Sequence, residues 1–494
     1  MKSDRLRFRL GSAAALLAGL LLRLWFVVHM GHVSGDSLVY GGIAKTWLQH
    51  GVYGYVEPGP TPGSMEIRPT LIRLPGYPIF LAACFRIFGI DHYFAAMYLQ
   101  VAADLLTCLL AAALAARLFG RRAALPVLWI AALCPFTASY VAAPLTETLV
   151  LTTIALAFYA FARWQAAGAG FNPWLWVIAI TLAYSLLLRP DQGLLAAAIL
   201  PAMLWRSLTA GPQPASPPRT GPLLLRPALP VAAAALLVVL PLAPWTVRNW
   251  RAFQVLQPLV PRYANDPGEM PPLGFARWYR TWAIEFASTD QVYWNYNGDR
   301  IEFASLPTRA LAARSPQASE DLRDRTAALL ADYNLTTTVT PAIDDRFAVL
   351  ADQRVRDHPV LYYLALPLAR LLNMLLRPRT DMLPIADEWW RWSQHPAQTA
   401  FAAAYAALNL AYLVLGLAGF CVWMRRRWLS PISPDRATHC CRELAFAMAA
   451  ATLLRAALLL TVDNSEPRYT LEFFPTLFVL AGALFARPPI PDRL

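Results

Sequence analysis

Two acidic residues stand where an apolar run meets a polar segment, and a carboxylate in that position can act as a general base on a hydroxyl. Asp36 follows the first apolar run, and Glu147 stands at the edge of the fourth. Acidic groups near a bilayer core are costly and usually functional. The structural alternative is a helix start, because acidic residues favour that position. We predict Asp36 and Glu147 as the catalytic candidates.

Four arginines are expected on the same side of the membrane as these acids: Arg68, Arg73, Arg189 and Arg468. Outer loops are depleted in arginine, so cations close to the spans need a reason. A lipid-linked phosphate is one, because a guanidinium gives it a bidentate, charge-assisted hydrogen bond. The alternative is pairing with Asp191 or Glu466, or with lipid headgroups. We predict that these arginines bind the phosphate of a donor.

The remaining charged residues, histidines and sequence motifs do not indicate a further catalytic site. Asp104 faces the interior of the second apolar run, where pairing with Arg23 or Arg455 is the expected role. The seven histidines show no HxxxH or HxH spacing, so a histidine metal site is not indicated. The chain also lacks a Walker motif, a GxGxxG after a strand and a GxSxG motif. Nucleotide-driven and serine-hydrolase mechanisms therefore have no support.

The elements that must position these residues are membrane spans. Of 494 residues, 57% are hydrophobic and only 15% are charged, against roughly 45–50% and 25% in soluble domains. This excludes a soluble enzyme, a disordered protein and a basic nucleic-acid module. Apolar runs of roughly 18–25 residues match a hydrocarbon core of about 30 Å. We predict ten spans, the first running from after Arg7 to about Met30 and the others near 92–116, 123–143, 146–163, 173–188, 192–206, 228–246, 400–423, 444–462 and 471–487.

The net charge of +12 is distributed as an orientation signal. With the N-terminus inside, the inside segments hold 18 Lys/Arg against 4 Asp/Glu, whereas segment 248–399 holds 17 of each sign. Such an excess of cations marks the cytoplasmic side. We predict an integral protein of a bacterial inner (plasma) membrane with both termini cytoplasmic, and no nucleic-acid partner.

Three parts of the chain follow from this topology. Residues 1–247 form an N-terminal transmembrane module that carries the first outer loop, 31–91. Residues 248–399 form an extracytoplasmic domain of mixed structure, or a lid, and residues 400–494 supply the last transmembrane helices. Segment 359–376 is apolar enough to span, but a proline and an arginine interrupt it. We favour a helix that lies in the outer interface or re-enters the membrane.

Several short motifs, in their order along the chain, resemble the GT-C glycosyltransferases. More closely, they resemble the protein O-mannosyltransferase-like branch that includes the lipid A aminoarabinose transferases. The matching stretches are Gly35-Asp36-Ser37 with Tyr40, Ala44 and Gly51; Arg73-Leu74-Pro75-Gly76-Tyr77-Pro78-Ile79-Phe80-Leu81-Ala82; Pro144-Leu145-Thr146-Glu147-Thr148-Leu149; Pro244-Trp245-Thr246-Val247-Arg248-Asn249; and Arg468-Tyr469 with Pro475. The resemblance covers roughly 1–250 and 400–494.

The resemblance implies an all-α polytopic enzyme that passes a sugar from a polyprenyl-phosphate donor to a hydroxyl of a lipid, glycan or protein acceptor, with inversion. Asp36 would be the general base, Glu147 a second carboxylate in the cavity, and Arg73 and Arg468 would hold the donor phosphate. Ser37 departs from the family, which often has a second acid there, so a divalent-metal requirement is left open. The alternative function is a transporter or flippase for lipid-linked saccharides. Transporters, however, usually show repeats and charges near the midplane.

Overall fold

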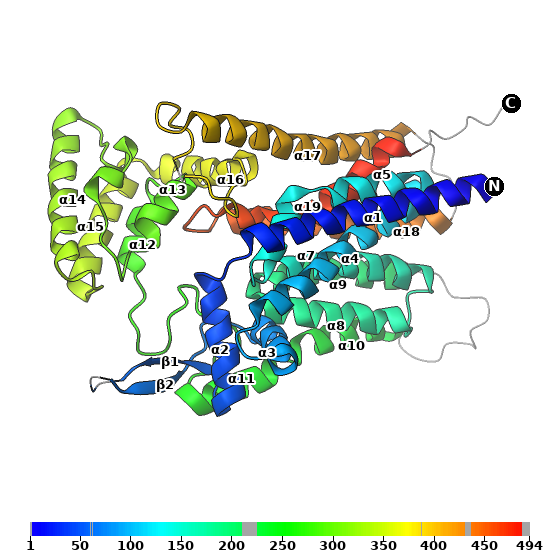
Figure 1. The fold of residues 1–494 in the computed structure, drawn as a ribbon, viewed down its shortest axis with the longest axis horizontal. Helices are drawn as coiled ribbons and strands as arrows, with labels where there is room; N and C mark the ends of the chain where they lie inside the picture. The colour runs from blue at the N-terminus through cyan, green and yellow to red at the C-terminus, as the bar shows by residue number, and fades with distance from the viewer. Residues whose placement is uncertain are drawn as a thin grey trace. The chain divides into compact units, whose positions relative to one another are not determined.

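The computed structural model describes residues 2–59, 61, 63–209, 225–386, 388–429 and 436–486. Most of these residues are helical, and the only strands among them form one hairpin, so the predicted all-α class is confirmed. The chain divides into two units (Figure 1). Unit 1 comprises Met1–Ala264, Ala411–Leu454 and Leu471–Leu494, and unit 2 comprises Asn265–Leu410 and Arg455–Thr470. The predicted domain boundaries stay a prediction.

Unit 1 is a helical bundle built from the predicted apolar runs. Its core consists of α4 packed on α5 and α7, with α7 packed on α8 and α1 packed on α4 and α5. The helices are α1 (Lys2–Met30), α4 (Tyr93–Phe119), α5 (Arg121–Ala132), α6 (Pro135–Ser139), α7 (Glu147–Ala166), α8 (Pro173–Leu188), α9 (Gly193–Thr209), α10 (Leu225–Val239), α11 (Leu242–Phe253) and α19 (Phe474–Ala481). Two long helices, α17 (Pro396–Leu429) and α18 (Arg436–Leu459), contribute residues to both units.

The number of clear spans differs from the predicted ten. Five helices in the described part of the chain are long and apolar enough to cross a membrane, or up to seven if each of two bent pairs is one span. α8 has 16 residues and rises only about 24 Å at 1.5 Å per residue, which is short of the hydrocarbon thickness. The last predicted span is divided into a 3₁₀ segment (Pro467–Phe473), α19 and a second 3₁₀ segment (Gly482–Phe485). The chain is nevertheless a multi-pass membrane protein.

A buried ion pair ties three helices of unit 1 together. Arg23 of α1 donates from Nε to the Asp104 carboxylate of α4 at 2.7 Å, and its Nη1 donates to the Ala132 carbonyl of α5 at 2.7 Å. Both charged side chains are almost fully buried. The prediction that Asp104 pairs inside the membrane is confirmed, with Arg23 as its partner. A buried charge needs such a partner, because desolvating a lone ion costs several kcal/mol.

The first outer loop is built from two helices and a hairpin. It contains α2 (Asp36–His50), an antiparallel hairpin of β1 (Gly54–Pro58) and β2 (Met65–Pro69), and α3 (Gly76–Phe88). Gly54 pairs with Pro69 at the open end of the hairpin. Burial of Tyr53, Leu71 and Trp245 in one apolar cluster holds this loop on α11.

Arg248 of α11 fastens the same loop. Its Nη1 donates to the Thr70 carbonyl at 2.7 Å, and its Nη2 donates to the Tyr53 carbonyl. The guanidinium also lies 5.2 Å from the Tyr53 ring centre and 5.3 Å from that of Trp245, a separation at which cation–π attraction operates. The hairpin, which carries Arg68, is therefore held by a side chain almost 180 residues away in the sequence.

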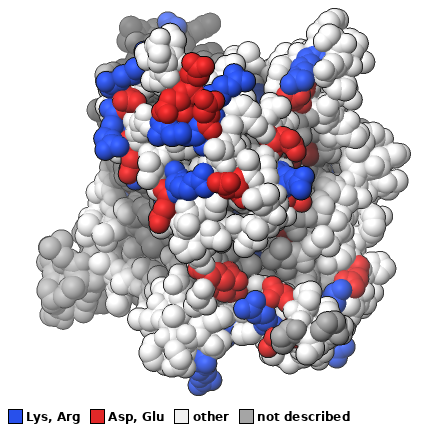
Figure 2. Space-filling model, turned by 90° about the vertical axis from the view of Figure 1, so that its left-hand side faces the viewer, with Lys and Arg blue, Asp and Glu red and all other residues white. Residues whose placement is uncertain are grey.

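Unit 2 is helical in its described residues, so the strands of the fold lie in the first outer loop and not in the predicted mixed domain. Its helices are α12 (Leu273–Arg280), α13 (Phe286–Ser288), α14 (Pro316–Thr336), α15 (Pro341–Asp357) and α16 (Leu366–Leu376). An aromatic core that includes Phe275, Trp278, Tyr279, Trp282 and Phe347 fills the space between α12, α14 and α15. Acidic and basic side chains alternate over the face in Figure 2, which shows no extended patch of one sign.

The apolar segment 359–376 is helical. It consists of a π-helical turn (Leu361–Ala365) followed by α16. The helix pair Pro341–Asp357 and Leu361–Leu376 bends by 103°, the geometry of a broken span or a re-entrant loop. The interfacial alternative stays a prediction.

Candidate functional site

The first predicted carboxylate forms an ion pair with the first predicted cation. Asp36 is the first residue of α2, and the N-cap residue of this helix is Gly35. Arg73, in the turn before α3, donates from Nη2 to the Asp36 carboxylate at 2.7 Å. The Asp36 side chain is 28% exposed and that of Arg73 is 22% exposed, so both remain within reach of a ligand. A helix-start role alone does not explain Asp36, because its carboxylate binds a second segment.

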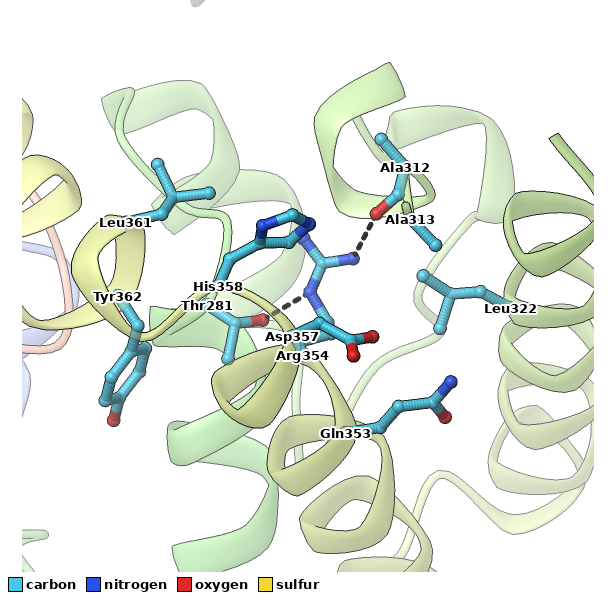
Figure 3. A pocket seen from close by; sticks show the side chains of 10 residues that line it. All are labelled: Thr281, Ala312, Ala313, Leu322, Gln353, Arg354, Asp357, His358, Leu361 and Tyr362. Atoms are coloured by element: carbon cyan, nitrogen blue, oxygen red, sulfur yellow. Dashed lines mark hydrogen bonds between the residues drawn. The ribbon is translucent and has the colours of Figure 1, made fainter. Parts of the chain in front are cut away.

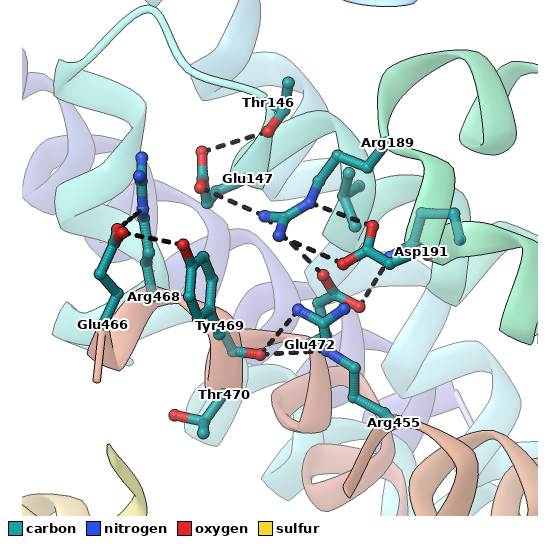
Figure 4. A network of polar contacts seen from close by, with 12 residues as sticks. Thr146, Glu147, Arg189, Asp191, Arg455, Glu466, Arg468, Tyr469, Thr470 and Glu472 are labelled. Atoms are coloured by element: carbon teal, nitrogen blue, oxygen red, sulfur yellow. Dashed lines mark hydrogen bonds and ion pairs between the residues drawn. The ribbon is translucent and has the colours of Figure 1, made fainter. Parts of the chain in front are cut away.

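The second predicted carboxylate belongs to a larger charged cluster. Glu147 begins α7 and is nearly buried, and Arg189 lies at the turn after α8. Arg189 lies 3.4 Å from Glu147, 3.2 Å from Asp191 and 4.0 Å from Glu472 (Figure 4). One guanidinium therefore faces three carboxylates. The predicted alternative for Arg189, pairing with Asp191, is present in the structure together with the contact to Glu147.

A buried tyrosine, Tyr40, lies beside the first ion pair. It lies one turn after Asp36 on α2, is buried, and packs edge-on against Tyr77 at 5.1 Å. The Arg73 guanidinium lies over its ring at 5.7 Å. Burial raises the pKa of Tyr40 to about 12, and the charges of Arg73, Asp36, Glu147 and Arg189 act on the same hydroxyl. The phenol therefore stays protonated at neutral pH, with both ion pairs around it.

A close backbone contact brings the two pairs together. A Cβ on Gly76, at the start of α3, would lie 2.5 Å from the carbonyl carbon and oxygen of Leu187, two residues before Arg189. Only glycine lets the turn that carries Arg73 approach the end of α8 so closely. The Tyr184 hydroxyl also donates to the Gly76 carbonyl at 3.4 Å. The glycine of the Arg-Leu-Pro-Gly motif thus has a spacing role.

A buried amide fixes the segment before Glu147 to the same turn. The Tyr77 hydroxyl donates to Gln100 Oε1 at 2.6 Å. Gln100 Nε2 donates in turn to the Ala143 carbonyl at 2.8 Å. The chain entering α7 is therefore set relative to α3 by hydrogen bonds, which a buried polar group requires.

The other two predicted arginines pair with different carboxylates. Arg68 lies on β2, is more than half exposed, and pairs with Glu57 of β1 at 2.7 Å. Arg468 belongs to unit 2, where it pairs with Glu466, the predicted alternative. The Tyr469 hydroxyl donates to the same carboxylate at 2.8 Å (Figure 4). Roles for Arg68 and Arg468 at a donor phosphate stay predictions.

Sequence reasoning missed three members of the site in unit 1. Glu472 lies in the cluster around Arg189, and Gln192 holds it by donating from Nε2 at 2.7 Å. Gln192 is buried and also accepts from Ser185 at 3.4 Å. The position of Glu472 four residues after the Arg of the Arg-Tyr motif was the available signal. Tyr40 belongs to one of the predicted motifs, but the motif spacing does not predict that the Arg73 guanidinium lies over its ring.

No three His, Cys, Asp or Glu side chains in the described part of the chain come together in a way that could hold a metal ion. The carboxylates around Arg189 are arranged on a cation of the protein itself.

No protein-family model matches the chain, and no curated protein does. Among solved structures, it is similar to the oligosaccharyltransferase AglB from Archaeoglobus fulgidus in complex with an inhibitory peptide and a dolichol-phosphate, at 12% identity over 97% of this chain and 50% of that one, with a TM-score of 0.45. It is also similar to ArnT from Cupriavidus metallidurans bound to undecaprenyl phosphate, at 14% identity over 97% and 77%, with a TM-score of 0.32. Both neighbours are GT-C glycosyltransferases, the superfamily that the motifs resemble. The chain spans about half the length of the archaeal protein.

Proposed function

We propose that this chain is a membrane glycosyltransferase of the GT-C type, which moves a sugar from a polyprenyl-phosphate donor to an acceptor hydroxyl with inversion. The observation that carries the proposal is the pairing of Asp36 with Arg73 and of Glu147 with Arg189, on segments that meet where Gly76 packs against Leu187. These four residues come from four separate stretches of sequence. They supply a base and cations in one place, as the reaction requires.

Asp36 is proposed as the general base. It takes the proton of the acceptor hydroxyl while that oxygen forms a bond to the anomeric carbon, and the bond from this carbon to the phosphate oxygen breaks. The electron pair of the broken bond leaves with the polyprenyl phosphate. Because a phosphate is already a good leaving group, a preorganised cation is enough to stabilise it.

Arg73 is the proposed cation for that leaving phosphate. Its ion pair with Asp36 is partly exposed, so a phosphate can compete for the guanidinium. A guanidinium has five N–H donors in a fork that matches phosphate oxygens. When the Arg73 guanidinium exchanges the Asp36 carboxylate for the phosphate, the carboxylate becomes able to accept a proton. Donor binding is thereby coupled to activation of the base.

Arg189 is better suited to hold the carboxylates than the phosphate. Glu147, Asp191 and Glu472 surround it, and their combined charge lowers the positive potential that an anion would meet. Glu147 is then the second carboxylate of the cavity, fixed near Tyr40 by Arg189. In this proposal the reaction takes place at the outer face of the membrane, as the distribution of arginine along the sequence predicts.

The direct test is sugar transfer by membranes that contain the protein, using a panel of radiolabelled polyprenyl-phosphate monosaccharides. Donor-dependent labelling of a lipid, glycan or protein fraction is expected. Asp36→Asn should reduce transfer by at least about 100-fold, the scale of losing a general base. Donor movement across the membrane without product would instead indicate a flippase.

Asp91→Asn is the matched control. Asp91 is also an ion-paired acid of the first outer segment, with Lys45 at 2.6 Å, but half of its side chain is exposed. Loss of one surface pair is worth about 1 kcal/mol or less, so transfer should remain. Equal activity of the two variants would remove Asp36 from the role of base.

A further inference from the structure

Unit 2 contains a pocket of about 390 Å³, including its open mouth, that the proposed glycosyl transfer does not use. It lies between the end of α12, the loop before α14, and the end of α15 (Figure 3). Leu322 and Tyr362 supply apolar wall, while Thr281, Arg354 and His358 supply polar groups.

The cation in this pocket is bonded only to neutral oxygens. Arg354 donates from Nε to the Thr281 hydroxyl at 2.9 Å and from Nη2 to the Arg309 carbonyl at 2.9 Å. Its Nη1 donates to the carbonyls of Ala310 and Ala312 at 2.8 and 3.1 Å. Four of its five N–H groups are thereby used, and no carboxylate of the described residues forms an ion pair with it. One N–H group of Nη2 remains.

The charge of Arg354 is therefore poorly compensated. Its helix, α15, carries seven charged residues. Burial lowers the pKa of Arg354 to about 10, the direction expected for a cation withdrawn from water, with nearby Asp357 opposing the change. Asp357 lies 3.6 Å from Arg314, which offsets the one acidic group in the pocket wall. His358, one residue after Asp357, also lines the pocket (Figure 3).

We propose that this pocket binds a small oxyanion, a carboxylate or a phosphate group, on Arg354 and His358. The bonds of Arg354 to the loop carbonyls also clamp that loop to α15, and this structural role is compatible with binding. A clamp alone needs neither an open cavity beside the guanidinium nor a second potential donor in its wall. The narrow space selects a small group, and its apolar wall suits the carbon atoms that carry it.

The test is isothermal titration calorimetry of the full-length protein in a neutral detergent, with sodium phosphate and sodium acetate titrated at constant ionic strength against a chloride background. Saturable binding of at least one of the two anions is expected. Ala312→Leu, at the exposed pocket wall, should weaken it at least tenfold while leaving the Arg354 bonds in place. Ala342→Leu, an exposed alanine at the start of α15 that does not line the pocket, should leave it unchanged.

Two further measurements complete the test. His358→Gln is a second, independent variant for the case that Ala312→Leu lowers the melting temperature. It retains a neutral polar side chain and should still weaken anion binding. Nanodiscs with phosphatidylglycerol in place of phosphatidylcholine distinguish the source of the anion: competition with phosphate assigns the site to lipid headgroups, and its absence assigns it to a solute. The proposal is overturned if neither anion binds saturably to the wild type, or if neither Ala312→Leu nor His358→Gln weakens binding.

Discussion

Gly76→Ala should disable the proposed site without touching any of its charged residues. The added Cβ would lie 2.5 Å from the Leu187 carbonyl group, where ordinary contact begins at 3.4 Å. The turn that carries Arg73 must then move away from the end of α8 by about 0.9 Å, because backbone cannot rotate aside as a flexible side chain can. A misplacement of roughly 1 Å at a catalytic geometry can cost about 100-fold in rate. Overpacking of this kind costs about 1–3 kcal/mol in stability.

The assay is the kcat/KM of sugar transfer from the donor found active in the screen, together with thermal unfolding of the purified variant. Gly42→Ala is the control: this glycine also lies in a helix of the first outer loop, but nothing comes within 4 Å of a Cβ there. Alanine should stabilise that helix by up to about 1 kcal/mol and leave transfer intact. A Gly76→Ala protein with wild-type kcat/KM and melting temperature would show that the close contact does not set the distance between the two ion pairs.

Three further substitutions test polar contacts within each unit. Arg23→Leu should lower the stability of unit 1 by about 3–5 kcal/mol by stranding the buried Asp104 carboxylate, and adding Asp104→Leu should recover part of that loss in thermal unfolding. Asp344→Ala removes the acceptor of two backbone N–H groups at the start of α12, at 2.7 and 2.9 Å, and should cost about 1–3 kcal/mol; an unchanged unfolding temperature would contradict this. Gln192→Leu removes the donor to Glu472 and should reduce kcat more than it raises the donor KM, whereas a purely structural role would alter the unfolding temperature alone.

The apolar runs predicted the helices of unit 1 closely, because burial in lipid forces every long apolar stretch to satisfy its own backbone hydrogen bonds. The prediction was weaker where prolines and short lengths matter. The run 471–487 is one apolar segment in the sequence, yet it is divided among three short helical pieces, of which α19 is the middle one. Hydropathy averages over such breaks, so it gives the apolar segment but not its division.

The hairpin of the first outer loop shows a second limit. Its strands are five residues each, and the segment between Gly51 and Pro78 is rich in glycine and proline, a composition typical of a loop. A two-stranded hairpin is marginal by itself. Packing of Tyr53 against Trp245 and the bonds from Arg248 stabilise it, and these partners are distant in the sequence.

The sequence by itself determined the class of the molecule and the type of its chemistry. Apolar run length, the sidedness of arginine, and acids at the ends of spans follow from transfer free energies that each segment carries locally. The tertiary structure alone decided which charges meet. It paired Asp36 with Arg73, gathered Glu472 and Gln192 at Arg189, and placed the ring of Tyr40 against the Arg73 guanidinium. Such pairings depend on how closely helices approach, and at Gly76 that distance is set by the absence of a single methyl group.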